Sequence, residues 1–149
     1  MSFVTKRVSK EIKKLDSEKL PYGIKVTPHQ DNILVWDAII SGGKDTPHEG
    51  LSYKVLIRIG DEYPAKPPHV KFISKIFHPN VYRDGQICID ILQGQWTPTL
   101  RIVSVLMSIQ SMLDDPNPNS PANAEAAKVY KTDQALYKKM IDDTYKQNK

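Results

Sequence analysis

The chain has 149 residues, of which 26% are charged and 40% hydrophobic, with a formal net charge of +4. This composition is typical of a globular protein, and the length suits one domain, so we expect residues 1–149 to form a single folded unit. Short apolar runs exclude a membrane span, the N-terminus lacks a secretory pattern, and scattered basic residues argue against direct nucleic-acid binding.

The first predicted element is an amphipathic helix near residues 3–18, ended by Pro21 and Gly23. Strand-like runs follow, and the turns between the first three are too short for crossover helices, which predicts an antiparallel meander. The connection 61–68 contains three prolines and is expected to be an exposed, rigid loop. The predicted strands are residues 24–26, 33–40, 53–59 and 70–73.

Residues 75–100 keep neither the helical nor the strand period, and an irregular segment of this length in a compact domain is commonly functional. A buried helix is predicted from Ile102 to Leu113, followed by two short helices near 122–131 and 132–147, the second capped by Thr132 or Asp133. The predicted fold is therefore α+β: a four-stranded antiparallel meander with an N-terminal helix, a central buried helix and two C-terminal helices.

Cys88 is the single cysteine of the chain and follows the turn-forming pair Asp84-Gly85. One thiol cannot form an internal disulfide or a multi-thiolate zinc site, so we expect no metal or other cofactor and a reducing compartment, cytoplasm or nucleus. A lone cysteine is more often a small buried hydrophobe than a nucleophile, and only its context favours reactivity.

Two polar residues ten and eight positions earlier could assist such a thiol. The side-chain amide of Asn80 could donate to an oxyanion, or it could bond local backbone and merely fix the loop. His78 could be the base of a cysteine hydrolase, but no orienting third residue or local signature of that class is found, which favours a structural role.

Five motifs occur in register along the chain. In order and spacing they resemble the signature of ubiquitin-conjugating enzymes, and the likeness runs from the Lys6-Arg7-x-x-Lys10-Glu11 helix to the last helix. The second half looks most like the branch that acts in histone ubiquitination and postreplication repair. The motifs are Tyr63-Pro64-x-Lys66-Pro67-Pro68, His78-Pro79-Asn80-Val81, Gly85-x-Ile87-Cys88-Ile89-Asp90-Ile91-Leu92, Trp96-Thr97-Pro98 and Asp115-Pro116-Asn117-Pro118-Asn119-Ser120-Pro121.

This resemblance implies a catalytic mechanism centred on Cys88. Cys88 would accept ubiquitin as a thioester from the activating enzyme and pass it to a substrate lysine together with a ligase. Asn80 would support the oxyanion, while Tyr82 and Asp90 would flank the incoming lysine. The alternatives are a non-catalytic ubiquitin-binding variant, against which the presence of Cys88 argues, and a cysteine hydrolase.

The resemblance also implies the docking surfaces of a monomer. Lys6, Arg7 and Lys10 would bind the activating enzyme. RING-type ligases would bind two loops: Tyr63, Pro64, Ala65, Lys66 and Pro67 in the first, and Trp96, Thr97, Pro98 and Thr99 in the second. Ala65 stands where some relatives have an aromatic anchor, and Ser120 where several have an aspartate.

Overall fold

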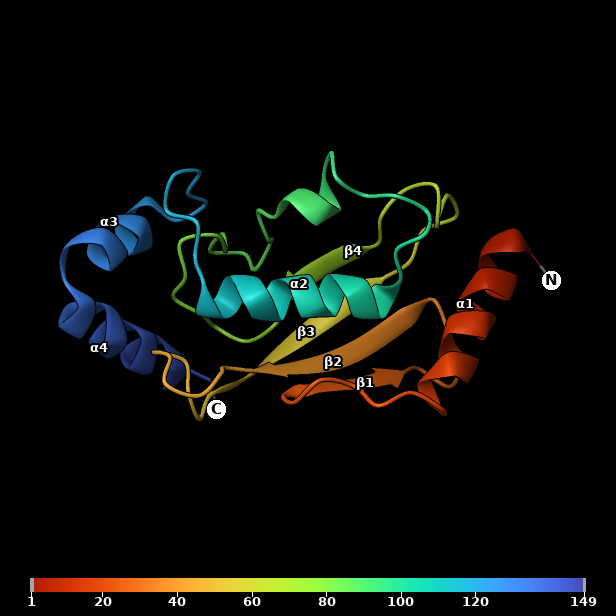
Figure 1. Cartoon of the computed structure of the whole chain (residues 1–149), viewed down its shortest axis with the longest axis horizontal. Helices are drawn as coiled ribbons and strands as arrows, with labels where there is room; N and C mark the ends of the chain where they lie inside the picture. The colour runs from red at the N-terminus through yellow and green to blue at the C-terminus, as the bar shows by residue number, and fades with distance from the viewer. Residues whose placement is uncertain (1, 149) are drawn as a thin grey trace.

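The computed structural model describes residues 2–148 and has the predicted α+β architecture, with one four-stranded sheet in the order β1-β2-β3-β4 (Figure 1). All three strand pairings are antiparallel, as a meander requires. Within residues 2–148, no helix is long and apolar enough to cross a membrane. The elements are α1 Phe3–Leu15, β1 Ile24–Pro28, β2 Val35–Ser41, β3 Ser52–Arg58, β4 His69–Phe72, the 3₁₀ turn η1 Asp90–Leu92, α2 Ile102–Asp114, α3 Ala124–Thr132 and α4 Gln134–Tyr145.

The main core lies between the sheet and α2. In β3 the buried residues Tyr53, Val55 and Ile57 alternate with more exposed ones, so one face of the sheet points inward. Helix α2 covers this inner face, while α1 lies at one end of the molecule and α3 and α4 lie at the other (Figure 1). The opposite face of the sheet, which we call the outer face, carries the alternate side chains.

Helix α1 is three residues shorter than its sequence pattern predicted. Leu15 is the last apolar residue at helical spacing, and beyond it the N–H groups of Asp16 and Ser17 bond the carbonyls of Lys13 and Lys14 in a tight turn. Glu18 then turns away from the helix axis and pairs with Arg101 at the start of α2, at 2.5 Å.

A second, smaller hydrophobic cluster lies under α3 and α4 and contains Phe77, Ala126, Tyr137 and Ile141. The side chain of Asp133 accepts the N–H of Leu136 and caps α4, which decides between the two predicted caps.

The expectation of an exposed loop at residues 61–68 is wrong for its anchoring residues. Tyr63 is only 2% exposed, and Pro64 and Pro68 are buried as well, whereas Ala65 and Lys66 face solvent. The phenol of Tyr63 donates to Glu11 of α1, and this bond draws the loop into the core. A proline-rich sequence indicates stiffness but not which side chains point inward.

Candidate active site

The turn before Cys88 depends on glycine. Gly85 has φ +93°, and a Cβ at this position would lie 2.1 Å from the carbonyl oxygen of Phe72. Its N–H bonds the carbonyl of Tyr82, and Asp84 Oδ1 accepts the N–H of Gln86. The predicted Asp-Gly turn is therefore confirmed, and it reverses the chain so that residues 86–88 run back along residues 80–82.

Cys88 is held by its backbone and keeps its sulfur accessible. Its N–H donates to the carbonyl of Asn80 at 2.8 Å, next to a β-bridge between Val81 and Ile87. The residue is half-buried, and Sγ lies 3.9 Å from the carbonyl oxygen of Ser120, a long contact even for a thiol. The thiol is thus neither sealed in the core nor engaged in a strong hydrogen bond among the described residues.

The side chain of Asn80 ties the cysteine's neighbourhood to the segment after α2. Its Nδ2 donates to the carbonyl of Asn117 and its Oδ1 accepts the N–H of the same residue, both at 2.8 Å. Asn80 is 3% exposed. Asn80 therefore does fix backbone, but the expectation of a local partner is wrong, because Asn117 lies 37 residues away. The second N–H of the amide donates to no group among residues 2–148.

His78 serves as a structural residue, because both of its ring nitrogens are occupied. Nδ1 accepts the N–H of Asn80 at 3.0 Å, and Nε2 bonds the carbonyl of Met112 in α2 at 2.8 Å. These partners require the neutral tautomer with the proton on Nε2. Burial lowers the pKa of His78 to about 4. A neutral imidazole fixed in this way is not a base for Cys88.

Tyr82 and Asp90 flank the cysteine along the chain and point toward solvent. Tyr82 is 48% exposed, so packing against its own loop does not account for its side chain. Asp90 is exposed at the start of η1, and its carbonyl, not its carboxylate, accepts the N–H groups of Gln93 and Gln95 that close the turn. Both side chains are therefore available to an incoming group.

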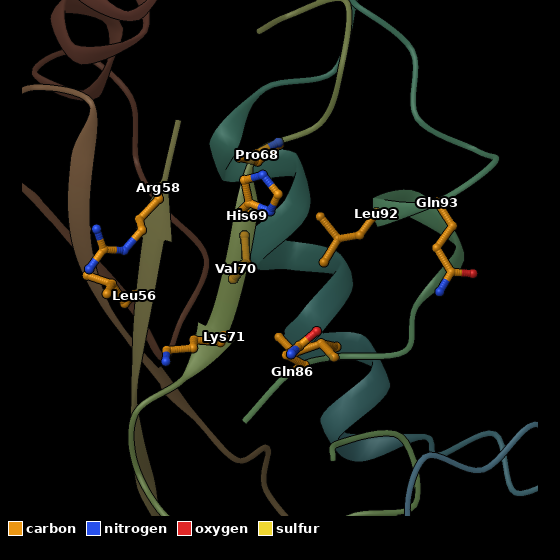
Figure 2. A pocket seen from close by; sticks show the side chains of 10 residues that line it. Leu56, Arg58, Pro68, His69, Val70, Lys71, Gln86, Leu92 and Gln93 are labelled. Carbon is orange, nitrogen blue, oxygen red and sulfur yellow. The ribbon is translucent and has the colours of Figure 1, made fainter. Parts of the chain in front are cut away.

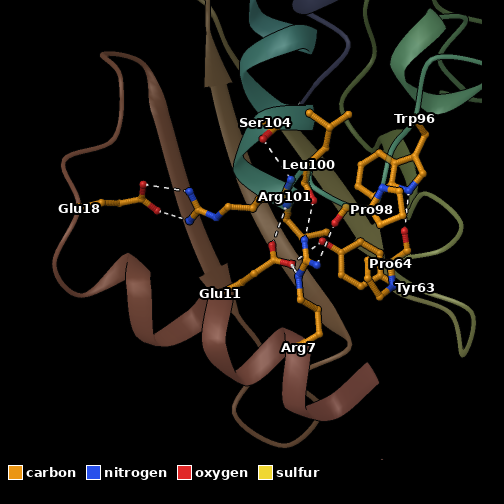
Figure 3. Close-up of polar contacts among 11 residues, drawn as sticks. Arg7, Glu11, Glu18, Tyr63, Pro64, Trp96, Pro98, Leu100, Arg101 and Ser104 are labelled. Carbon is orange, nitrogen blue, oxygen red and sulfur yellow. Dashed lines mark hydrogen bonds and ion pairs between the residues drawn. The ribbon is translucent and has the colours of Figure 1, made fainter. Parts of the chain in front are cut away.

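The three basic residues predicted to dock the activating enzyme separate into two groups. Lys6 and Lys10 are exposed on α1. Arg7 is turned inward, where Nη1 donates to the carbonyl of Pro98 at 2.9 Å and Nη2 to that of Leu100 at 2.7 Å (Figure 3). The guanidinium of Arg7 thus belongs to the interior contacts of the second loop and not to the exposed basic face.

Glu11 is the centre of these contacts and was not predicted as a functional residue. It is 4% exposed and accepts hydrogen bonds from Arg7 at 2.9 Å, from the Tyr63 phenol at 2.5 Å and from the backbone N–H of Ile102 at 2.9 Å (Figure 3). Burial, followed by the bond to Glu11, raises the pKa of Tyr63. The signal in the sequence was a carboxylate on the same helical face as Val4 and Val8, four residues after Arg7.

The two loops predicted to bind ligases lie side by side. The indole N–H of Trp96 donates to the carbonyl of Pro64 at 2.8 Å, and the rings of Tyr63 and Trp96 are 5.8 Å apart. We call the linked side chains of Arg7, Glu11, Tyr63 and Trp96 the docking frame. The frame leaves a joint exposed surface on the two loops, made of Ala65, Lys66, Thr97, Pro98 and Thr99.

Comparison with known proteins agrees with this geometry. A family model described as ubiquitin-conjugating enzyme matches residues 7–145. The chain belongs to the ubiquitin-conjugating enzyme family. It is 48% identical over 139 residues to "Ubiquitin-conjugating enzyme E2 2" of Saccharomyces cerevisiae, covering 93% of this chain and 80% of that protein. It is 49% identical over 143 residues to "Ubiquitin-conjugating enzyme E2 1" of Caenorhabditis elegans, covering 96% of this chain and 74% of that protein.

These relatives carry two differently numbered names at nearly equal identity, so they show the family rather than a branch within it. As a ubiquitin-conjugating enzyme, the chain is a ubiquitin transferase.

Proposed function

We propose that Cys88 carries ubiquitin as a thioester and transfers it to a substrate lysine. In the first step the Cys88 thiolate attacks the thioester carbonyl of ubiquitin bound to its activating enzyme; the new C–S bond forms and the activating enzyme's thiol leaves. In the second step a lysine amine attacks the same carbon, forms an amide and releases the Cys88 thiol. The observation that carries this proposal is the accessible sulfur on a backbone fixed by Asn80.

The occupied histidine distinguishes this function from hydrolysis. A thioester must survive in water until an amine arrives, so a free base beside it would be harmful because it would activate water. His78 is buried with both nitrogens bonded. This arrangement disfavours the cysteine hydrolase.

The second step needs help with charge and with a proton. Attack makes the carbonyl carbon tetrahedral and its oxygen negative, and the remaining N–H of Asn80 is the proposed donor to that oxygen. The amine must be neutral to attack, although a free lysine has a pKa near 10.4. We assign Tyr82 to desolvating the lysine and Asp90 to orienting it, since both side chains face solvent near Cys88.

Docking to the two partner enzymes is assigned to separate surfaces. Lys6 and Lys10 steer the activating enzyme to α1, and Arg7 supports that helix from inside. RING-type ligases bind the joint loop surface, with Tyr63, Pro64, Pro67 and Trp96 shaping it from beneath. We propose that the chain works as a monomeric single catalytic domain in the cytoplasm or nucleus, where its free thiol stays reduced.

The proposal is tested by mixing the purified chain with ubiquitin, activating enzyme and ATP and separating the products on non-reducing gels. We expect an adduct of one ubiquitin that thiol reductant removes. Cys88→Ala should form no adduct, and Cys88→Ser should form one that resists reductant because it is an oxygen ester. An adduct that persists in Cys88→Ala would place the acceptor elsewhere.

A further inference from the structure

A cavity of about 400 Å³, which Cys88 does not line, lies where β3 and β4 face the segment from Gln86 to Gln93 (Figure 2). This size is within the range of about 300–1,000 Å³ that holds small ligands. Its lining combines three basic side chains, Arg58, His69 and Lys71, with apolar groups. The proposed thioester chemistry makes no use of it.

The charge lining the cavity is uncompensated. None of its lining residues is a carboxylate, and within residues 2–148 neither Arg58 nor Lys71 forms an ion pair. Across the sheet, Asp37 is opposite Leu56 in the register and bonds His29 at 2.9 Å, and at the other end of the cavity Asp84 accepts the side-chain N–H of Gln86. An anion entering the cavity would therefore meet two permanently cationic side chains without a competing internal partner.

The edge of β4 allows only a compact ligand. The N–H of Phe72 points away from β3 and bonds the carbonyl of Gly85. By strand alternation Val70 faces the same way, toward Ile87 across the bridge between Lys71 and Gln86. Pro68 has no N–H, and Lys71 is bridged to Gln86. The edge of β4 therefore offers no open row of backbone groups to an added peptide strand.

The two ends of the cavity differ in chemistry. Figure 2 shows Arg58, Leu56 and Lys71 on one side of β4, and Leu92, Gln86 and Gln93 on the other. The first end is cationic; the second has an apolar side chain between two amides. Gln86 already donates to Asp84, so its amide oxygen remains as an acceptor.

We propose that this cavity binds a small phosphate monoester carried on a flat ring, the chemistry shared by nucleoside and aryl monophosphates. The phosphate, with a charge of about −1.5 to −2 at neutral pH, lies between Arg58 and Lys71. The ring lies against Leu92, within reach of the side-chain amides. A ligand with one negative charge would neutralise only one of the two cationic side chains, Arg58 and Lys71. A ring without phosphate would neutralise neither.

The test is a titration of the ¹⁵N-labelled full chain followed by amide NMR shifts, with AMP, phenyl phosphate, adenosine and inorganic phosphate as separate probes. We expect saturable shifts at Val70, Lys71 and Leu92 with AMP, and affinity at least about tenfold weaker for adenosine because the charge-assisted bonds are lost. Phenyl phosphate shows whether the ring is recognised by hydrogen bonds. If it binds as tightly as AMP, the side-chain amides do not bond the base; if it binds more weakly, they do. Both results agree with the proposal.

Arg58→Gln combined with Lys71→Gln should weaken AMP binding at least about tenfold. Lys54→Gln is the matched control, because Lys54 is exposed on the same face of β3 but does not line the cavity. Absence of saturable shifts, equal affinity for inorganic phosphate, or an equal loss in the Lys54 variant would overturn the proposal. Charging of Cys88 should be unchanged in the double variant, so failure here and failure of the thioester proposal are separate results.

Discussion

The docking frame and the surroundings of Cys88 hold their functional groups in opposite ways. In the frame, Arg7 and Glu11 use their side-chain polar atoms in bonds that reach 52 to 93 residues along the chain. Around the cysteine, the bonds are made by the backbone and by Asn80 and His78, while among residues 2–148 Sγ makes one long polar contact, at 3.9 Å. The surface proposed for partner recognition thus rests on immobilised side chains, whereas the sulfur proposed as the nucleophile is accessible on an immobilised backbone.

The difference between the two regions follows from the function proposed for each. A docking surface that had to become ordered on binding would bind more weakly, because ordering its side chains costs conformational entropy. A nucleophile that was strongly bonded in the free enzyme would have to break that bond before it reacted. The two regions should therefore depend unequally on their side-chain contacts.

The largest effect is expected from Glu11→Ala. The change removes the carboxylate that pairs Arg7 and leaves the Tyr63 phenol and the Ile102 N–H buried without an acceptor, so the free energy of unfolding should fall by about 3–5 kcal/mol. Urea unfolding measures this. Glu62→Ala, which breaks only an exposed pair with Lys66, should change it by less than about 0.5 kcal/mol. Similar losses in the two variants would mean that the frame is not a structural centre.

Lowering the pH should reduce the free energy of unfolding, because the histidine that fixes the backbone near Cys88 takes up its proton on unfolding. A second histidine, His48, is also buried, and its ring centre lies 5.9 Å from that of His78. Burial lowers the pKa of His78 to about 4 and that of His48 to about 3, so both are neutral when folded, while the unfolded chain takes up protons near pH 6.5. Stability is therefore full above pH 6.5 and is lost as the pH falls below it, by about 2 kcal/mol for each histidine at pH 5. Urea unfolding at pH 7 and pH 5 measures the combined loss of unfolding free energy from the two histidines. If NMR shows that His78 titrates near pH 6.5 in the folded protein, the prediction is contradicted.

Asn80→Ala distinguishes the structural role of Asn80 from its proposed role in the transfer reaction. We expect normal charging of Cys88 and discharge to lysine about 100-fold slower, the usual cost of losing an oxyanion donor. Single-turnover discharge of the purified thioester measures the rate. Asn119→Ala, at an exposed position in the same connecting segment as Asn117, should discharge at the wild-type rate. Equal rates in Asn80→Ala and wild type would leave Asn80 with its structural role alone.

The smallest effect belongs to the exposed part of α1. Changing Lys6 and Lys10 to Gln should slow charging a few-fold at low salt and hardly at all at high salt, because exposed charges act mainly on encounter rates. Initial charging rates at two salt concentrations measure this. The control changes Lys128 and Lys131 on α3 to Gln, which removes the same charge at the other end of the molecule. An equal slowing in the control would indicate net charge rather than a docking surface.

Periodicity was sufficient to predict most of the fold. Alternation along β3 and the apolar spacing of α2 depend only on neighbours in sequence, and both elements lie within a residue of their predicted bounds. Cys88 could be singled out because it is the single cysteine and lies in a motif of residues near it in sequence.

Contacts between distant residues could not be predicted. The sequence pattern places Arg7 on a basic helix face. In the structure its side chain points inward because the guanidinium donates to the carbonyls of Pro98 and Leu100. The anchoring of Asn80 by Asn117 likewise depends on how two irregular segments meet. The strand register that places Leu56 opposite Lys71, and so forms the cationic end of the cavity, is set by the turns between strands.

The most direct test of the account is the fate of ubiquitin on Cys88 when no ligase is present. The charged enzyme is freed of ATP and divided between buffer with and without free lysine, and loss of the thioester is followed by mass spectrometry. The account predicts slow loss in buffer and many times faster loss with lysine, giving a lysine–ubiquitin amide. Rapid release of free ubiquitin at the same rate in both samples would contradict it, because Cys88 would then be serving a hydrolase.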